Sequence, residues 1–109
     1  MAITSTQTNN KGIAHAVAGA YVSTSTAAAF TLTLGFTAEY FKIVNVASGG
    51  LVSLEWYKGM AANSAIKTGA DGAVSVINTN GITVSAGTVT VGLDTDLNVV
   101  SEQTYWMAF

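Results

Sequence analysis

The stretch from Tyr40 to Lys58, YFKIVNVASGGLVSLEWYK, decides the fold. It contains two runs rich in β-branched and aromatic residues, separated by Ser48-Gly49-Gly50, and this arrangement predicts an antiparallel hairpin. Every other residue of the second run is apolar, which is the period of a strand with one buried face. We expect the face that carries Trp56 to lie in the core.

Further strands are predicted on both sides of this hairpin. From Phe30 to Leu34, apolar residues alternate with threonines. From Val74 to Val84, two strands are predicted around Asn80-Gly81, the strongest short signal for a hairpin turn. The run of strands continues with Thr88 to Gly92 and closes with Leu97 to Val100 and Thr104 to Phe109. The residues expected in the core are Phe41, Ile43, Val52, Leu54, Trp56 and Val84.

Three segments lack a strand pattern. Residues 1–12 are polar and low in complexity, which predicts a flexible N-terminal arm. In the Ala-rich residues 13–29, a short helix over Ile13 to Ala20 competes with an extended segment that ends at Tyr21-Val22. Gly59 to Gly69 breaks the alternation and predicts a loop or one helical turn. The expected fold is therefore mostly β, a small antiparallel β-sandwich or barrel in which residues 13–109 form a single domain.

Composition limits the classes of partner. The chain has 109 residues, enough for one domain, and 9% of them are charged, with a formal net charge of −2. It contains no arginine, and its four lysines are scattered, whereas nucleic acids and anionic membranes attract clustered cations. We expect no binding to nucleic acid or membrane. A polar surface so poor in charge favours a subunit that is covered in an assembly, with a soluble monomer as the alternative.

The residues offer little for catalysis. There is no cysteine, and His15 is the only histidine. No serine lies in a Gly-x-Ser-x-Gly elbow, so we expect no enzyme and no cofactor. Asp94-x-Asp96-x-Asn98 matches the start of a calcium loop. Val99 and Tyr105 stand where that loop needs glycine and a bidentate glutamate, so a solvated turn is the prediction and a weak structural cation the alternative.

Paired carboxylates and aromatic residues each have a functional and a structural interpretation. Glu39 and Glu55 could approach each other across the hairpin, but exposed glutamates on the wet side of a sheet explain them equally well. Four aromatic residues could form a sugar-binding platform, although aromatic residues in small β domains more often pack in the core. These four are Trp56, Tyr57, Trp106 and Tyr105. The apolar end of the chain, TYWMAF, predicts a strand packed in the core or against a neighbour.

The sequence of the central region resembles a family of phage proteins. The segments that carry the resemblance are Thr31 to Phe36, Phe41 to Val46, Leu54 to Ala61, Ser64 to Thr68 and Gly81 to Val84. They follow the form TLTLGF…(V/I)NV…EWYxGM…AIKT…GITV, which is similar to small virion proteins of tailed bacteriophages. The resemblance covers residues 30–92 and includes no catalytic residues.

This resemblance implies a capsid decoration, or cement, protein that binds the outer capsid surface and stabilises the head. The implied partners are the major capsid protein and further copies of the chain, with a homotrimer expected. The residues expected to make capsid or subunit contacts are Ile3, Thr4, Gln7, Asn10, Tyr105, Trp106 and Phe109. The alternatives are a head-fibre or tail-associated glycan-binding module and a neck or tail subunit of the virion.

Overall fold

The computed structural model describes residues 15–22, 28–47 and 51–109. Residues 1–14, which include all four predicted arm contacts, lie outside the described part of the chain. The described residues form eight strands. These are β1 (Val17–Val22), β2 (Phe30–Thr33), β3 (Tyr40–Asn45), β4 (Val52–Tyr57), β5 (Ser64–Thr68), β6 (Val74–Ser85), β7 (Thr88–Val91) and β8 (Gln103–Ala108).

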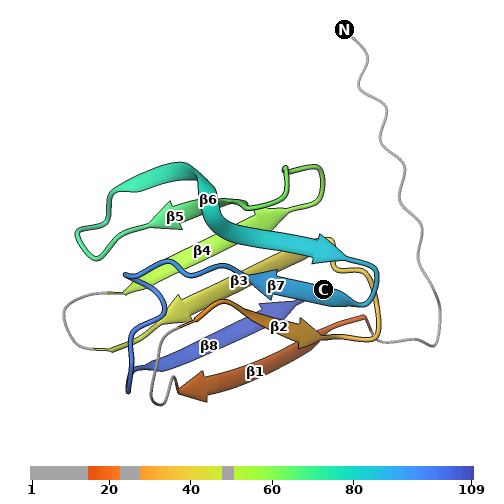
Figure 1. Ribbon diagram of the computed structural model, residues 1–109, viewed down its shortest axis with the longest axis horizontal. Helices are drawn as coiled ribbons and strands as arrows, with labels where there is room; N and C mark the ends of the chain where they lie inside the picture. Colours follow the sequence, from red (N-terminus) through yellow and green to blue (C-terminus); the bar gives the residue numbers. More distant parts are fainter. Residues whose placement is uncertain (1–14, 23–27, 48–50) are drawn as a thin grey trace, which may run out of the picture.

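All eight strands belong to one antiparallel sheet in the order β1-β8-β3-β4-β5-β6-β7-β2. The sheet curls into a half-barrel, so that β2 and β7 lie across from β3 and β8 (Figure 1). The predicted mostly β fold is confirmed. It is one continuous curled sheet, whose two free edges, β1 and β2, approach each other through the rings of Tyr21 and Phe30, 4.6 Å apart.

The hairpin predicted from Tyr40 to Lys58 is present as β3 and β4. Its register places Phe41 opposite Trp56 and Ile43 opposite Leu54. Its turn residues, 48–50, lie outside the described part of the chain. Because facing side chains of an antiparallel pair lie on the same side of the sheet, this register places the apolar residues of both strands on the inner face.

The core lies inside the curl. Of the predicted core residues, Phe41, Ile43, Val52, Leu54 and Trp56 are buried. Val84 is partly buried and packs against the others. The core is completed from β5, β6, β7, β8 and the connections that precede β3 and β8. Its further buried apolar members are Ala38, Ala65, Ile82, Val89, Val91, Leu97 and Ala108.

The Ala-rich segment is extended rather than helical, as far as the structure describes it. Val17–Val22 forms the edge strand β1 and pairs with β8 along its whole length. Gly19 explains part of this preference, because a Cβ there would lie 2.5 Å from Cζ2 of Trp106. The small residues of this segment therefore let a strand lie close to a large ring, which composition alone does not distinguish from a helix.

The prediction of a loop or helical turn over Gly59 to Gly69 is wrong in its second half. Ser64–Thr68 is strand β5, which pairs with both β4 and β6. Its sequence, SAIKT, hides the alternation because Lys67 lies on the inner side. There the Lys67 ammonium forms salt bridges with Asp94 and Asp96. A charged residue therefore occupies an inward-facing position at which a strand pattern predicts an apolar one.

Asn80-Gly81 is not a hairpin turn. Strand β6 runs through it from Val74 to Ser85, pairing first with β5 and then with β7. The β5 register jumps at this point, since Ser64 faces Ile82 while Ala65 faces Ile77. Asn80 has a positive φ of 56°, but Gly81 does not, whereas the expected turn type requires it at both. The pair is a bend in one strand, where β6 changes partners.

Leu97 to Val100 is also not a strand. It belongs to a turn in which the backbone N–H groups of Leu97 and Asn98 donate to the carbonyl oxygen of Asp94, at 3.1 and 2.8 Å. The side chains of Leu97 and Asn98 point into the protein and are buried. The predicted strand Thr104 to Phe109 is confirmed as β8, which lies between β1 and β3.

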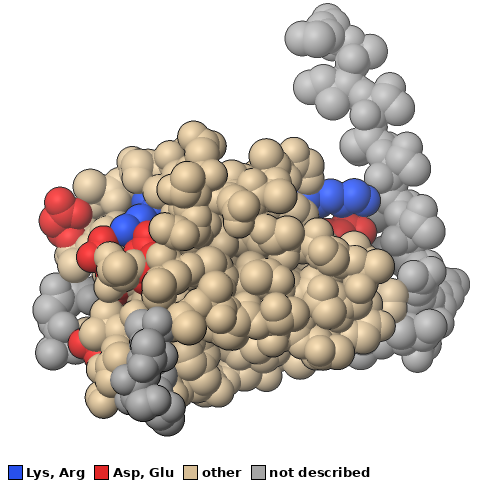
Figure 2. Space-filling view, in the orientation of Figure 1, with Lys and Arg blue, Asp and Glu red and all other residues tan. Residues whose placement is uncertain are grey.

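The wall of the half-barrel formed by β2, β7 and the second half of β6 carries a polar but uncharged surface, which we call the threonine face. Register aligns its hydroxyls in two rows across β2, β7 and β6. The rows are Thr31, Thr90 and Thr83, and Thr33, Thr88 and Ser85. Figure 2 shows no charged side chain over the centre of this layer, and charges only toward its ends.

Candidate functional site

The opposite side of the half-barrel, which we call the outer face, exposes large apolar side chains. Cross-strand pairs place Met107 beside Lys42 and Ala18, and Tyr105 beside Val44 and Ala20. Tyr105, Met107 and Phe109 are 49, 43 and 48% exposed. A contiguous exposed apolar surface is typical of a contact with another macromolecule, because isolated exposed apolar residues need no explanation but clusters do.

One end of the outer face is an aromatic patch of Tyr40, Tyr57 and Phe109. The Tyr40 ring packs edge-on against Tyr57 at 5.1 Å and stacks on Phe109 at 4.9 Å. The strand register places Tyr40 opposite Tyr57, and the Phe109 N–H continues the β8 ladder by donating to the Tyr40 carbonyl. The patch is therefore held by backbone pairing and presents ring surface at fixed positions.

Glu55 is bound by the hydroxyls of this patch. The Tyr40 and Tyr57 hydroxyls both donate to Glu55 Oε2, at 2.8 and 3.3 Å. Burial, and then the hydrogen bond to Glu55, raise the pKa of the Tyr40 hydroxyl well above its usual range. The carboxylate is thus used to orient the tyrosines, and the aromatic patch presents them with their hydroxyls already bonded.

A groove of about 260 Å³ lies beside the patch, between β1, β8 and β3. Its lining is almost wholly apolar, with small residues of β1 on one side and larger side chains of β8 and β3 on the other. The lining residues are Ala18, Gly19, Lys42, Val44, Tyr105, Trp106 and Met107. The Lys42 ammonium is the one formal charge among these residues.

The predicted contact residues at the end of the chain divide between the two sides of the sheet. Tyr105 and Phe109 are exposed on the outer face. Trp106 points to the inner side, where it is partly buried and stacks on Phe41 at 6.1 Å. The other predicted contacts, Ile3, Thr4, Gln7 and Asn10, lie outside the described residues.

Sequence reasoning missed Lys42 and Val44 as surface-contact candidates, and it did not separate Met107 from Trp106 within the apolar end of the chain. The alternation of β8 contains the signal, since Tyr105, Met107 and Phe109 share one parity and Trp106 has the other. Lys42 and Val44 have the opposite parity to the core residues of β3, which also places them on the outer face.

The sugar-binding platform, the alternative to core packing for four aromatic residues, is not assembled. Trp56 is 7% exposed and Trp106 lies on the inner side, whereas Tyr57 and Tyr105 are on the outer face. The four rings therefore do not share one surface. The exposed aromatic surface of the described chain is formed by tyrosines and Phe109 instead.

The Asp94-x-Asp96-x-Asn98 turn is buried at Asp94 and Asn98 rather than solvated as predicted. Lys67 Nζ lies 2.9 Å from Asp94 Oδ2 and 2.7 Å from Asp96 Oδ2. Asp94 Oδ1 also accepts the backbone N–H groups of Asp96 and Leu97. The Lys67 ammonium thus takes the position next to these carboxylates that the alternative prediction gave to a metal cation.

Asn98 extends this turn into the sheet. It accepts a hydrogen bond from the Tyr21 hydroxyl and donates to the Gly92 carbonyl at 2.9 Å. Burial raises the pKa of Tyr21. The turn therefore joins β1, β5 and the end of β7 through side chains, which is a structural role.

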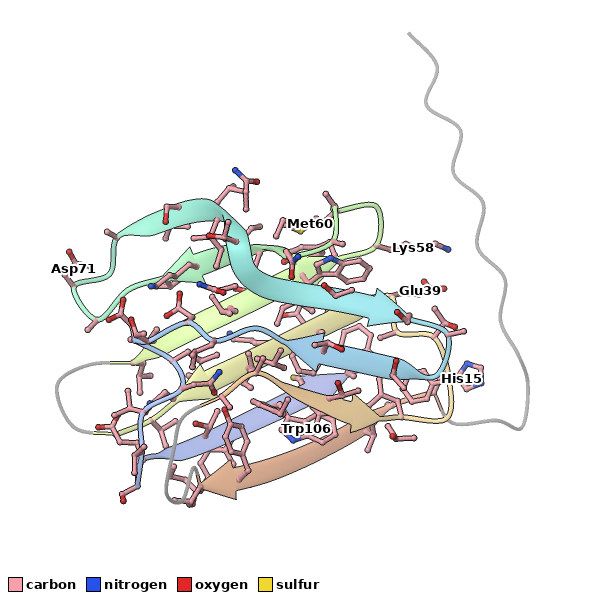
Figure 3. The ribbon with its side chains drawn as sticks, in the orientation of Figure 1. His15, Glu39, Lys58, Met60, Asp71 and Trp106 are labelled. Atoms are coloured by element: carbon pink, nitrogen blue, oxygen red, sulfur yellow. The ribbon has the colours of Figure 1, made fainter. Side chains whose placement is uncertain are left out.

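The remaining candidates do not converge in the described part of the chain. His15 is exposed and stacks on Phe36 at 5.3 Å. Glu39 pairs with Lys58 at 3.8 Å, and these two side chains lie at the same end of the molecule as His15 (Figure 3). Glu39 and Glu55 are not paired in the hairpin register. Within the described ranges, no group of three or more acidic, histidine or cysteine side chains is arranged to hold a metal ion.

The same described ranges contain no helix that is long and apolar enough to cross a membrane. Comparison of the chain with protein-family models, curated proteins and solved structures finds no match.

Proposed function

We propose that this chain is a non-enzymatic structural subunit of a tailed-bacteriophage virion, a decoration protein that binds the outer surface of the capsid and stabilises the head. Its partners in this proposal are the major capsid protein and further copies of the chain, associated as a homotrimer. The observation that carries the proposal is the aromatic patch of Tyr40, Tyr57 and Phe109 on the exposed outer face.

The patch has the chemistry of a protein contact. Tyrosine, phenylalanine and methionine are enriched at the centres of protein interfaces, and charged residues are depleted there. Because the rings are fixed by strand pairing and by the bonds to Glu55, docking would cost little side-chain entropy. A binder whose work is adhesion needs this combination of rigidity and apolar area.

The two walls of the half-barrel, both seen from their solvent side, suggest an orientation. The threonine face is polar and uncharged, and suits contact with water (Figure 2). The outer face is the more apolar side and therefore gains more from being covered. In the proposal the outer face is directed toward the capsid shell and its neighbours, and the threonine face toward solvent.

The test uses capsids of the phage that encodes the chain, with the decoration protein removed. The variant Tyr57→Ser/Phe109→Ser deletes two exposed rings of the patch. If each ring contributes about 1–2 kcal/mol, the apparent affinity in cosedimentation falls by more than tenfold. Thr31→Ser/Thr33→Ser, on the threonine face, is the matched control and should bind like the unchanged protein. Equal saturation by the patch variant and the unchanged protein would contradict the proposal.

A further inference from the structure

The charged groups of the described chain are almost all bonded to other side chains. Lys58 pairs with Glu39, and Lys67 pairs with Asp94 and Asp96. Glu55 accepts bonds from two tyrosines, and Glu102 Oε1 accepts one from the Asn45 amide at 3.0 Å. Two charged side chains of the described ranges have no such partner. These are Lys42 and Asp71.

Lys42 is without a partner although a carboxylate lies opposite it. Its cross-strand neighbour is Glu55, and such a pair would ordinarily form a salt bridge. Here the Glu55 carboxylate is bound by Tyr40 and Tyr57 instead. Lys42 also lines the apolar groove between β1, β8 and β3. A cation on the wall of an apolar groove favours an occupant that brings a carboxylate next to an apolar side chain.

Asp71 supplies a carboxylate close to exposed apolar side chains, at the end of the sheet away from the groove. It lies in the turn between β5 and β6, and Figure 3 shows it at the tip of that turn, directed away from the molecule. Asp71 Oδ1 accepts only the backbone N–H of Ala73, at 3.0 Å. At the start of β6, which follows this turn, Val74 and Val76 are 65 and 64% exposed, the largest exposed fractions among the large apolar residues of the described chain.

The valines lie on the same side of the sheet as the groove. Val76 pairs with Ile66, which pairs with Glu55, and Glu55 is opposite Lys42. Since facing residues share a side, Val76 and Val74 lie on the convex side of the sheet, as Lys42 does. One surface of the molecule therefore carries both an apolar groove with a lone cation and an apolar strand end with a lone carboxylate.

We propose that the groove at Lys42 binds the β5–β6 turn of a second copy of this chain, with Asp71 of that copy paired to Lys42 and its Val74 and Val76 packed against Val44, Tyr105 and Met107. The two contact surfaces are different parts of one molecule, so the contact is head-to-tail. Such a contact closes into a ring when the rotation between neighbours permits, and otherwise gives an open chain of subunits. The charge complementarity gives the contact its direction.

This inference deepens the part of the proposed function in which copies of the chain associate. It can be tested without a capsid, so its failure is separable from a failure of capsid binding. The aromatic patch of Tyr40, Tyr57 and Phe109 is left free for another partner. It remains available to bind the shell.

The experiment is sedimentation of the full chain over a range of micromolar concentrations. The unchanged protein should associate, and the association constant should fall as ionic strength rises. Lys42→Asp and Asp71→Lys each place like charges together and should each weaken association roughly tenfold. The double variant Lys42→Asp/Asp71→Lys should restore it, because the pair is reversed rather than removed. Lys58→Asp, in an exposed pair outside the contact, is the control and should leave association unchanged.

Three results would overturn the inference. These are a protein that stays monomeric throughout, an oligomer that neither single variant weakens, and single-variant losses that the double variant does not reverse. Thermal unfolding of each variant, followed by circular dichroism, checks that all are folded. The substituted side chains are at the surface of the described chain, and we expect unfolding midpoints close to that of the unchanged protein.

Discussion

Replacing Gly81 by alanine tests whether β6 really passes through Asn80-Gly81 as one bent strand. A Cβ at this position would lie 2.5 Å from the Asn63 carbonyl oxygen and 2.6 Å from the Ser64 carbonyl carbon. Both are backbone atoms. They are held in place because Gly81 N–H donates to the Asn63 carbonyl and Asn63 N–H donates to the Ile82 carbonyl, each at 3.1 Å.

The size of the effect follows from what must move. Overpacking of this kind costs about 1–3 kcal/mol, and each displaced backbone hydrogen bond adds about 1 kcal/mol. Alanine has less conformational freedom than glycine in the unfolded chain, and this offsets about 0.4–1 kcal/mol of the loss. We expect a net loss of about 2–3 kcal/mol in the free energy of unfolding. For a domain of this size, that lowers the unfolding midpoint by about 10–20 °C.

The assay is thermal and urea unfolding followed by circular dichroism. Gly69→Ala is the matched control, because its Cβ would lie 3.1 Å from the tip of the Asp71 side chain and at an ordinary contact distance, 3.8 Å, from the Ala73 carbonyl oxygen. That variant should stay within about 0.5 kcal/mol of the unchanged protein. A hairpin turn would tolerate Asn at position 81, since Asn adopts positive φ readily. If Gly81→Ala or Gly81→Asn unfolds with the midpoint of the unchanged protein, the bent strand is wrong.

Three further predictions address the polar contacts and the N-terminal segment. Lys67→Met leaves the buried Asp94 carboxylate without its cation, and urea titrations should show a free energy of unfolding lower by about 1–3 kcal/mol. The control, Lys58→Met, removes a lysine from an exposed pair and should change the free energy of unfolding by less than about 0.5 kcal/mol. Because the folded-state pKa of Tyr40 is raised, its contribution to stability is complete below about pH 10 and is lost as the pH rises further. Unfolding midpoints measured above pH 10 should therefore fall less steeply for Tyr40→Phe, and identical slopes would show that Tyr40 is not the group responsible. Deletion of residues 1–12 should weaken capsid binding and leave the circular dichroism spectrum intact, and a truncated protein that saturates capsids at the same concentration would exclude a contact by the arm.

The parts of the fold that sequence predicts are those in which alternation and burial agree. Phe41, Ile43, Leu54 and Trp56 alternate with polar or surface residues, and all four are buried on one face. The hairpin is recognisable because apolar strands and a Gly-Gly turn are adjacent in sequence. Local pattern and tertiary packing point to the same structure there.

The errors arise where a distant partner determines the local structure. Lys67 makes β5 look irregular until Asp94 and Asp96 are brought beside it by the fold. Gly81 resembles a turn glycine in sequence. In the structure, the backbone of Asn63 and Ser64 on the neighbouring strand leaves no room for a side chain at this position. Neither contact is visible to a short sequence window, because its partners lie many residues away.

The candidate site shows the same division. Tyr105 and Phe109 were predicted as contact residues from the apolar end of the chain, and both are exposed on the outer face. Parity along β8 could have separated Trp106 from them. The groove required knowledge that β1 lies beside β8, which no turn or repeat in the sequence indicates.

An image reconstruction of the intact phage particle is the most direct test of the central claim, that this sheet is an adhesive subunit on the head. We predict density for the chain on the outer capsid surface, with Tyr40, Tyr57 and Phe109 against the shell and the threonine face toward solvent. A particle with no such density on its outer surface, or with the threonine face against the shell, would contradict it.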